Sequence, residues 1–288
     1  MEETSVPAAA VHATGEAAAP LSLAQRLHFD VYGFVLLPKV LTAHEVTDLR
    51  RALGRLNADP QPAASRVYLN QDQPHIRHFG NLLEYDAAFL HYATHPTLVE
   101  AAAVTVGGPV RIEEVEAIVN RRAASADVAA LRRERSRPRG FHAGTQHGWG
   151  TFEEDHHFHC LFVKTLAYLT DVGPEDGGTA VIPGSHRLTW PRDEVIRAAH
   201  SDPQLVHQVE AAVGSVLLFA ESLIHSTTTI TSENERMVII AGYTPPMMQV
   251  WPGNEVSPEF IQGLGPEMRQ LVAPPPWPWR RGPWRGRS

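Results

Sequence analysis

The 288-residue sequence contains one cysteine, Cys160, and this scarcity excludes an internal disulfide framework and a cysteine-rich zinc site. Cys160 itself is expected to be a small buried apolar residue beside a strand. No stretch approaches the length of an uninterrupted apolar membrane span, and the acidic N-terminus lacks the basic and apolar regions of a signal peptide. These absences favour a cytoplasmic protein that is not inserted in a membrane.

An excess of positive charge is also missing. The sequence has 25 basic and 32 acidic residues, a formal net charge of −7, so binding to a nucleic-acid polymer is not expected. Histidine, in contrast, is abundant: 16 residues, enough to direct attention to metal binding.

Composition divides the chain into three parts. Residues 1–20 are rich in Ala without periodic apolar spacing, which predicts a disordered tail. Residues 273–288 are rich in Pro, Trp and Arg and form a second tail, either disordered or packed as an extended strap. Residues 21–272 between them are predicted to form a single domain.

Within that domain, short segments predict flanking helices and a mainly β core. Ser22 is an N-cap residue, and Thr42 with Glu45 forms a capping-box pattern. Short apolar runs between 162 and 243 alternate with turn residues, which is typical of an antiparallel sandwich or barrel. The predicted helices are 21–29, 42–56, 83–91 and 96–106, and the predicted strands are 33–38, 110–120 and 159–169.

Arginine is concentrated in residues 121–139. The simpler interpretation is a solvated surface loop or helix. The alternative is a mobile arm whose guanidinium groups, including those of Arg121 and Arg122, bind an anionic small molecule such as a phosphate.

Three features together resemble one known family. They are the segment 30–56, the segment LTDVGPEDGGTAVIPGSHR at 169–187, and His225 followed eleven residues later by Arg236. This combination resembles the phytanoyl-CoA dioxygenase family of Fe(II)/2-oxoglutarate-dependent enzymes. The resemblance implies a double-stranded β-helix (a jelly-roll, cupin-like core) with helices on one outer face.

The resemblance also implies roles for particular residues. His225 matches the distal iron ligand, and Arg236 matches the arginine that pairs with the distal carboxylate of 2-oxoglutarate. Arginine suits this role because its planar fork makes two parallel hydrogen bonds to a carboxylate. Thr227 lies where a hydroxyl helps the same carboxylate, and Asn120 and Thr179 are weaker candidates for the cosubstrate pocket.

The first iron ligand comes from a group of five histidines. His142 and His147 both stand at a suitable distance before the LTDV turn, and His142 is preferred because FHAG keeps the family's arrangement around the ligand. His147 stays an alternative. The five candidates are His142, His147, His156, His157 and His159.

None of the five is followed at the second position by the Asp that completes the family's two-His, one-carboxylate iron site. Gly144 stands there after His142, and Trp149 after His147. A small residue in place of this Asp distinguishes Fe(II)/2-oxoglutarate halogenases, in which chloride fills the vacancy. The resemblance therefore implies a halide pocket at Gly144 and a chlorination that uses Fe(II), 2-oxoglutarate, O2 and chloride.

Two other functions stay open. One is a hydroxylase whose third ligand is water or a relocated acid, such as Glu153, Glu154 or Asp155. The other is a non-catalytic binding protein. Arg236 argues against it, because an inactive site would not need an arginine that binds the cosubstrate.

The substrate is predicted to be a small molecule of a biosynthetic pathway. The arginine-rich segment favours an anionic one, such as a phosphorylated metabolite or a nucleotide, and a substrate tethered to a carrier protein is an alternative. Trp149 and Phe152 are candidates for stacking on a substrate ring, although lid or core packing explains them equally simply.

Overall fold

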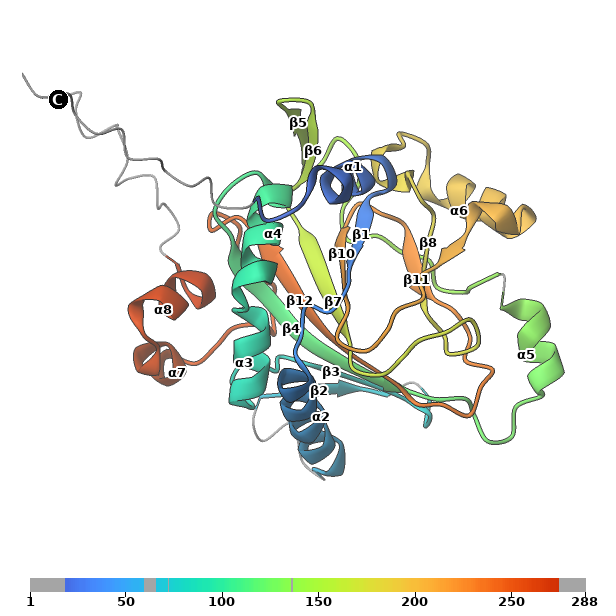
Figure 1. The fold of residues 1–288 in the computed structure, drawn as a ribbon, viewed down its shortest axis with the longest axis horizontal. Helices are drawn as coiled ribbons and strands as arrows, with labels where there is room; N and C mark the ends of the chain where they lie inside the picture. The colour runs from blue at the N-terminus through green and yellow to red at the C-terminus, as the bar shows by residue number, and fades with distance from the viewer. Residues whose placement is uncertain (1–18, 60–65, 72, 136, 275–288) are drawn as a thin grey trace, which may run out of the picture.

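Two antiparallel β-sheets enclose the centre of the molecule, and helices cover the outer face of the larger sheet (Figure 1). The computed structural model describes residues 19–59, 66–71, 73–135 and 137–274. Nearly all of both predicted tails, 1–20 and 273–288, lies outside these residues. The mainly β, jelly-roll fold class predicted from the sequence is confirmed.

The larger sheet has the strand order β1-β10-β7-β12-β4-β3-β2, and the smaller has the order β11-β8-β9. A separate two-stranded hairpin is formed by β5 and β6. The strands are β1 Phe34–Leu37, β2 Tyr68–Asn70, β3 Ile76–Gly80, β4 Arg111–Asn120, β5 Thr151–Glu154, β6 His157–Cys160, β7 Val163–Tyr168, β8 Thr179–Val181, β9 His207–Gln208, β10 Val216–Ala220, β11 His225–Thr227 and β12 Arg236–Thr244.

The helices begin where the sequence places capping residues. Ser22 and Thr42 both form complete capping boxes, with Gln25 and Glu45 respectively. The helix predicted over 83–91 begins later, because the Asp86 side chain accepts a hydrogen bond from Ala88 N and caps it there. The α-helices are α1 Leu23–Tyr32, α2 Ala43–Ala58, α3 Ala87–Ala93, α4 Pro96–Val106, α5 Val128–Glu134, α6 Arg192–Ser201, α7 Pro258–Gly263 and α8 Pro266–Val272.

The strands of the larger sheet divide their side chains between two cores. Alternate residues of a strand point to opposite faces, so Ala167, Leu218 and Ile239 join the large core under α2, α3 and α4. Their neighbours face the space between the sheets and form a second apolar cluster: Leu166, Tyr168, Leu217, Phe219, Val238 and Ile240, packed with Val181 of β8. Side chains at the ends of this inner cluster therefore face the interior of the jelly roll.

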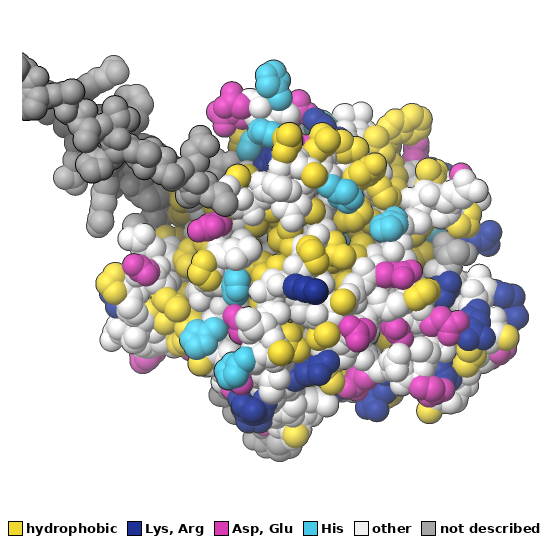
Figure 2. All heavy atoms as spheres, in the orientation of Figure 1, with side chains coloured by type: hydrophobic (Ala, Val, Ile, Leu, Met, Phe, Trp, Pro, Cys, Tyr) yellow, Lys and Arg dark blue, Asp and Glu magenta, His cyan; other side chains and the backbone are white. Residues whose placement is uncertain are grey.

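The arginine-rich segment lies beside the jelly roll rather than in its core. It contains the short helix α5, capped by Asp127 and without buried residues. Figure 2 shows Lys and Arg side chains gathered at this end of the visible face. None of the helices in the described ranges is long and apolar enough to cross a membrane.

Candidate functional site

His142 and His225 come together through the backbone. His225 begins β11, and each of the two residues donates its backbone N–H to the other's carbonyl at 2.9 Å. This pairing holds the two imidazole rings close together, with centroids 4.3 Å apart and ring planes tilted by 55°. His225 also packs edge-on against Phe219 of the inner core, 4.8 Å between centroids.

Both imidazoles are held in the form that leaves Nε2 available. His142 Nδ1 lies 2.9 Å from Gly140 O, and His225 Nδ1 lies 2.8 Å from Leu223 O. A carbonyl only accepts, so Nδ1 carries the proton in each ring and Nε2 presents its lone pair. Burial lowers the pKa of His225 to about 4, against the opposing charge of Glu221. His225 is therefore a neutral nitrogen donor at physiological pH, the form that binds transition metals.

His147 is not paired with His225. It lies farther along the loop, where it lines a cavity of about 420 Å³ together with Gly144 and Trp149. Trp149 is 64% exposed at this cavity. Phe152 is 37% exposed and stacks on His159 at 4.8 Å, in the β5–β6 hairpin, outside the lining of the cavities on either side of His142.

The space beside Gly144, predicted from the sequence to be a vacancy, contains a carboxylate. A Cβ atom added to Gly144 would lie 2.1 Å from Glu221 Oε2. The backbones also pair, since Gly144 N and Thr145 N donate to Glu221 O at 2.8 and 3.1 Å. Glu221 follows β10 directly, so it reaches the site from the turn whose backbone bonds to the 142–145 segment.

Glu221 is buried and faces both a histidine and a lysine. Its Oε1 lies 3.9 Å from His225 Nε2 and 3.5 Å from Lys164 Nζ. Burial raises the pKa of its carboxyl, but its neighbours, first among them the positive charge of Lys164, outweigh burial and leave that pKa below its usual value. Glu221 is therefore ionised at neutral pH.

Lys164 has a closer partner than Glu221. Its Nζ lies 2.7 Å from Glu114 Oε1. Burial raises the pKa of Glu114 to about 7, with Lys164 opposing the shift. One lysine thus lies between two buried acids, and only Glu221 also faces the histidine pair.

The predicted cosubstrate residues gather around Arg236, two positions along β11 and β8 from the level of His225. Arg236, 2% exposed, begins β12 and pairs in register with Asn120 of β4. Its Nη2 lies 3.4 Å from Thr179 Oγ1, and Thr179 pairs across β8 and β11 with Thr227. Within the described residues, Arg236 Nε and Nη1 have no hydrogen-bond partner. A buried guanidinium with open donors fits a carboxylate ligand, because such groups are costly to leave unpaired.

A second cavity, of about 610 Å³, joins the histidine site to the arginine-rich segment. Asn120, His142 and Thr227 line it. Four arginines also contribute to the lining: Arg121, Arg122, Arg137 and Arg139. Arg122 forms an ion pair with Glu233, and its Nε donates to Ser232 O at 3.2 Å.

The acids proposed from the sequence as relocated ligands lie elsewhere. Glu153 is on the β5 strand of the hairpin and forms an ion pair with Arg187, and Asp155 occupies the hairpin turn at a φ of 49°. The sequence signal for Glu221 was available but weak. It is an acid that directly follows the fully apolar strand VLLFA, four residues before His225.

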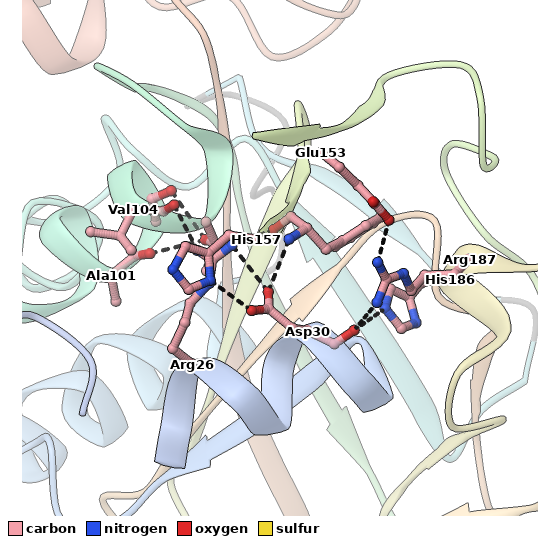
Figure 3. A network of polar contacts seen from close by, with 11 residues as sticks. Arg26, Asp30, Ala101, Val104, Glu153, His157, His186 and Arg187 are labelled. Atoms are coloured by element: carbon pink, nitrogen blue, oxygen red, sulfur yellow. Dashed lines mark hydrogen bonds and ion pairs between the residues drawn. The ribbon is translucent and has the colours of Figure 1, made fainter. Parts of the chain in front are cut away.

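A separate polar network accounts for two other histidines (Figure 3). Asp30 on α1 accepts from His157 Nδ1 at 2.9 Å and from Phe158 N at 3.2 Å, and it pairs with Arg26 at 3.0 Å. The buried His186 lies with Nε2 3.2 Å from Asp30 O. These contacts tie α1 to the β5–β6 hairpin, so the network stabilises the fold and His186 is not part of the histidine pair.

A jelly roll with a histidine pair at one point of its interior and a buried arginine at another defines a class of non-haem iron oxygenases that use 2-oxoglutarate. The chain belongs to the phytanoyl-CoA dioxygenase (PhyH) family, whose sequence pattern matches residues 29–238. This family consists of Fe(II)/2-oxoglutarate-dependent oxygenases. The two histidine nitrogens fit iron, and the buried Arg236 guanidinium fits the carboxylate of 2-oxoglutarate.

Individual relatives agree with this assignment. L-proline trans-4-hydroxylase of Streptomyces griseoviridis is 23% identical over 273 residues, which covers 84% of this chain and 92% of the relative. HygX of Streptomyces hygroscopicus, solved with nickel, 2-oxoglutarate and hygromycin B, has a TM-score of 0.65 and 23% identity over 82% of this chain and 93% of its own. SnoN, the epimerase of nogalamycin biosynthesis, has a TM-score of 0.60 and 19% identity over 84% and 90% of the two chains.

Proposed function

We propose that the protein is an Fe(II)- and 2-oxoglutarate-dependent hydroxylase of a small molecule. One observation carries the proposal: His142 and His225 present two free Nε2 atoms, while Arg236 keeps open donors in the same jelly-roll interior. His142 and His225 would hold the iron. Arg236, assisted by Thr179 and Thr227, would bind the distal carboxylate of 2-oxoglutarate. When bound, iron and 2-oxoglutarate supply the oxidation of a C–H bond by O2.

The chain's own residues contribute orientation and charge. The carbonyls of Gly140 and Leu223 fix both imidazole rings, so no reorientation is needed when metal binds. Burial in the inner core keeps water from the Arg236 guanidinium and strengthens its pairing with a carboxylate.

Hydroxylation is favoured over the chlorination that the sequence predicts at Gly144. A halide needs an empty space beside the histidines, and the Glu221 carboxylate fills it. A chloride ion placed there would also lie against a like charge, which is unfavourable in a buried site. The similarity to a proline hydroxylase supports the same choice.

The proposed substrate is anionic. Arg121, Arg137 and Arg139 line the cavity that reaches His142, and the guanidinium group is suited to binding phosphate or carboxylate. The size of this cavity, about 610 Å³, suits a small metabolite.

The test is to incubate the Fe(II)-loaded protein with 2-oxoglutarate, O2 and a panel of phosphorylated and carboxylated metabolites, with and without chloride or bromide. Succinate release and product masses are then measured. We expect substrate-dependent succinate and a product that gains oxygen at every halide concentration. Halogenated product would establish the chlorination alternative. Binding of 2-oxoglutarate without turnover across the panel would favour a non-catalytic protein.

A further inference from the structure

We infer that Glu221 is the carboxylate ligand of the iron site, moved from the position after His142 to the turn that follows β10, and that Gly144 is the glycine that makes room for it. The inference rests on the proposed function, because it concerns the same metal. The ligand is thus neither a halide nor one of the acids 153–155 that stand near His142 in the sequence.

A side chain at residue 144 and the Glu221 carboxylate would occupy the same position. In the usual arrangement an Asp at residue 144 would send its Cβ into the space now held by Glu221 Oε2, 2.1 Å away. The two residues are joined by the hydrogen bond from Gly144 N to Glu221 O, 2.8 Å. Glu is longer than Asp by one methylene group. A Glu in this turn can therefore bring its carboxylate to the place that an Asp at 144 would occupy.

The Glu221 carboxylate is buried and has few close partners. The Glu221 side chain is 3% exposed, and its Oε1 faces Lys164 Nζ at 3.5 Å, which is longer than an ordinary hydrogen bond. Buried carboxylate oxygens normally have closer partners, so this atom points to a ligand. It lies 3.9 Å from His225 Nε2. Two ligands at ~2.1 Å from one metal and at right angles are ~3 Å apart, so a side-chain movement of ~1 Å would let both bind.

That movement is required. Within the described residues, no three His, Cys, Asp or Glu side chains converge closely enough to hold a metal ion as they stand. Glutamate can make the adjustment through its χ angles without moving the backbone. Together with His142 and His225, it would form the two-His, one-carboxylate set of non-haem iron sites.

The competing explanation is that Glu221 only neutralises the buried Lys164. The distances argue against it, because Lys164 Nζ lies closer to Glu114, 2.7 Å, than to Glu221, 3.5 Å. Glu221 is therefore not the nearest acid to Lys164, although its charge acts on the lysine as well. Glu114 provides a matched control, since it is a buried acid on the same lysine but makes no ion pair with either histidine of the site.

The experiment compares Glu221→Gln with Glu114→Gln in the full-length protein. Anaerobic Fe(II) titration, bound iron after desalting, and the visible charge-transfer band formed with 2-oxoglutarate are measured, with circular dichroism to check folding. We expect Glu221→Gln to weaken Fe(II) binding at least ~100-fold, since removing even an outer partner costs 10–100-fold. Glu114→Gln should stay within ~3-fold of the wild type.

Equal loss in both variants, or wild-type binding by Glu221→Gln, would overturn the inference. Failure of the wild-type protein itself to bind Fe(II) and 2-oxoglutarate would overturn the proposed function instead. If Glu221→Gln does not fold, the combination of Gly144→Asp with Glu221→Ala provides the second test. It should regain Fe(II) binding if a carboxylate is needed at this place, and its failure to do so would overturn the inference.

Discussion

A carboxylate exchange between residues 144 and 221 offers the sharpest test of how this site is built. The structure predicts that Gly144→Asp alone is harmful, because the new Cβ would lie 2.1 Å from Glu221 Oε2. If both carboxylates ionise ~4 Å apart in a partly buried site, their repulsion is about 4 kcal/mol at an effective dielectric constant of 20. The single variant must therefore displace Glu221 or take up a proton.

Glu221→Ala alone removes the ligand but leaves Lys164 paired with Glu114 at 2.7 Å. A 100-fold loss of metal affinity corresponds to about 2.7 kcal/mol. The double variant removes the collision and restores one carboxylate, so we expect its affinity to return to within ~10-fold of the wild type. The double-mutant cycle should then give a favourable coupling of at least about 1.3 kcal/mol, increased by whatever affinity Gly144→Asp loses alone.

The assay is anaerobic Fe(II) or Co(II) titration of the four proteins by calorimetry, with melting curves recorded with and without metal. Metal bound to the native state should raise the melting temperature of the wild type and the double variant, and much less that of either single variant. Additive losses, with the double variant binding more weakly than Glu221→Ala, would refute the idea that the two positions supply the same carboxylate.

Four further predictions concern other parts of the molecule. Arg236→Met should weaken 2-oxoglutarate binding at least ~30-fold in calorimetry and leave Fe(II) binding within ~3-fold, because its open donors face no metal ligand. Arg137→Ala should raise the KM of an anionic substrate with little change in kcat, whereas Arg133→Ala, outside the cavity lining, should change neither. Burial lowers the pKa of His186 to about 4 in the folded state, against about 6.5 unfolded, so the unfolded state binds the extra proton and stability falls as pH drops from 6.5 towards 4. Urea unfolding should show that the free energy of unfolding falls between pH 7 and pH 4.5. This fall should be about 2–3 kcal/mol smaller in His186→Gln than in the wild type. Thr42→Ala should lower the free energy of unfolding by about 1 kcal/mol in the same assay, since it removes the capping box of α2.

Local signals in the sequence were sufficient for much of the fold. The capping residues Ser22 and Thr42 mark helix starts that the structure keeps. The helix predicted from Pro96 to Val106 has those bounds in the structure. The strand predicted over 159–169 is interrupted, because the chain leaves the β5–β6 hairpin at Cys160 and enters the larger sheet at Val163. The apolar periodicity of the sequence does not predict that the chain passes from one sheet to another at this point.

The site was predictable only where a residue's role depends on its own segment. His225 and Arg236 begin the consecutive strands β11 and β12, which lie in different sheets, and the structure buries both side chains. Glu221 follows no such rule. Its nearness to Gly144 is created by backbone pairing between residues 77 positions apart in the sequence, at 2.8 Å. A rule that searches only beside the first histidine cannot find a carboxylate that arrives from another strand.

The balance of charge explains why a single acid here would decide the chemistry. Fe(II) brings two positive charges, 2-oxoglutarate two negative ones, and Arg236 one positive, and imidazole nitrogens that bind a metal add no charge. One further anion beside the iron makes this set neutral, and Lys164 lies 2.7 Å from a second acid, Glu114. Glu221 and a bound chloride would therefore serve the same electrostatic purpose, and a site with both would carry an uncompensated buried charge. It follows that the glycine after His142 does not by itself indicate a halide pocket, because the space it opens is available to any carboxylate that the fold can bring there.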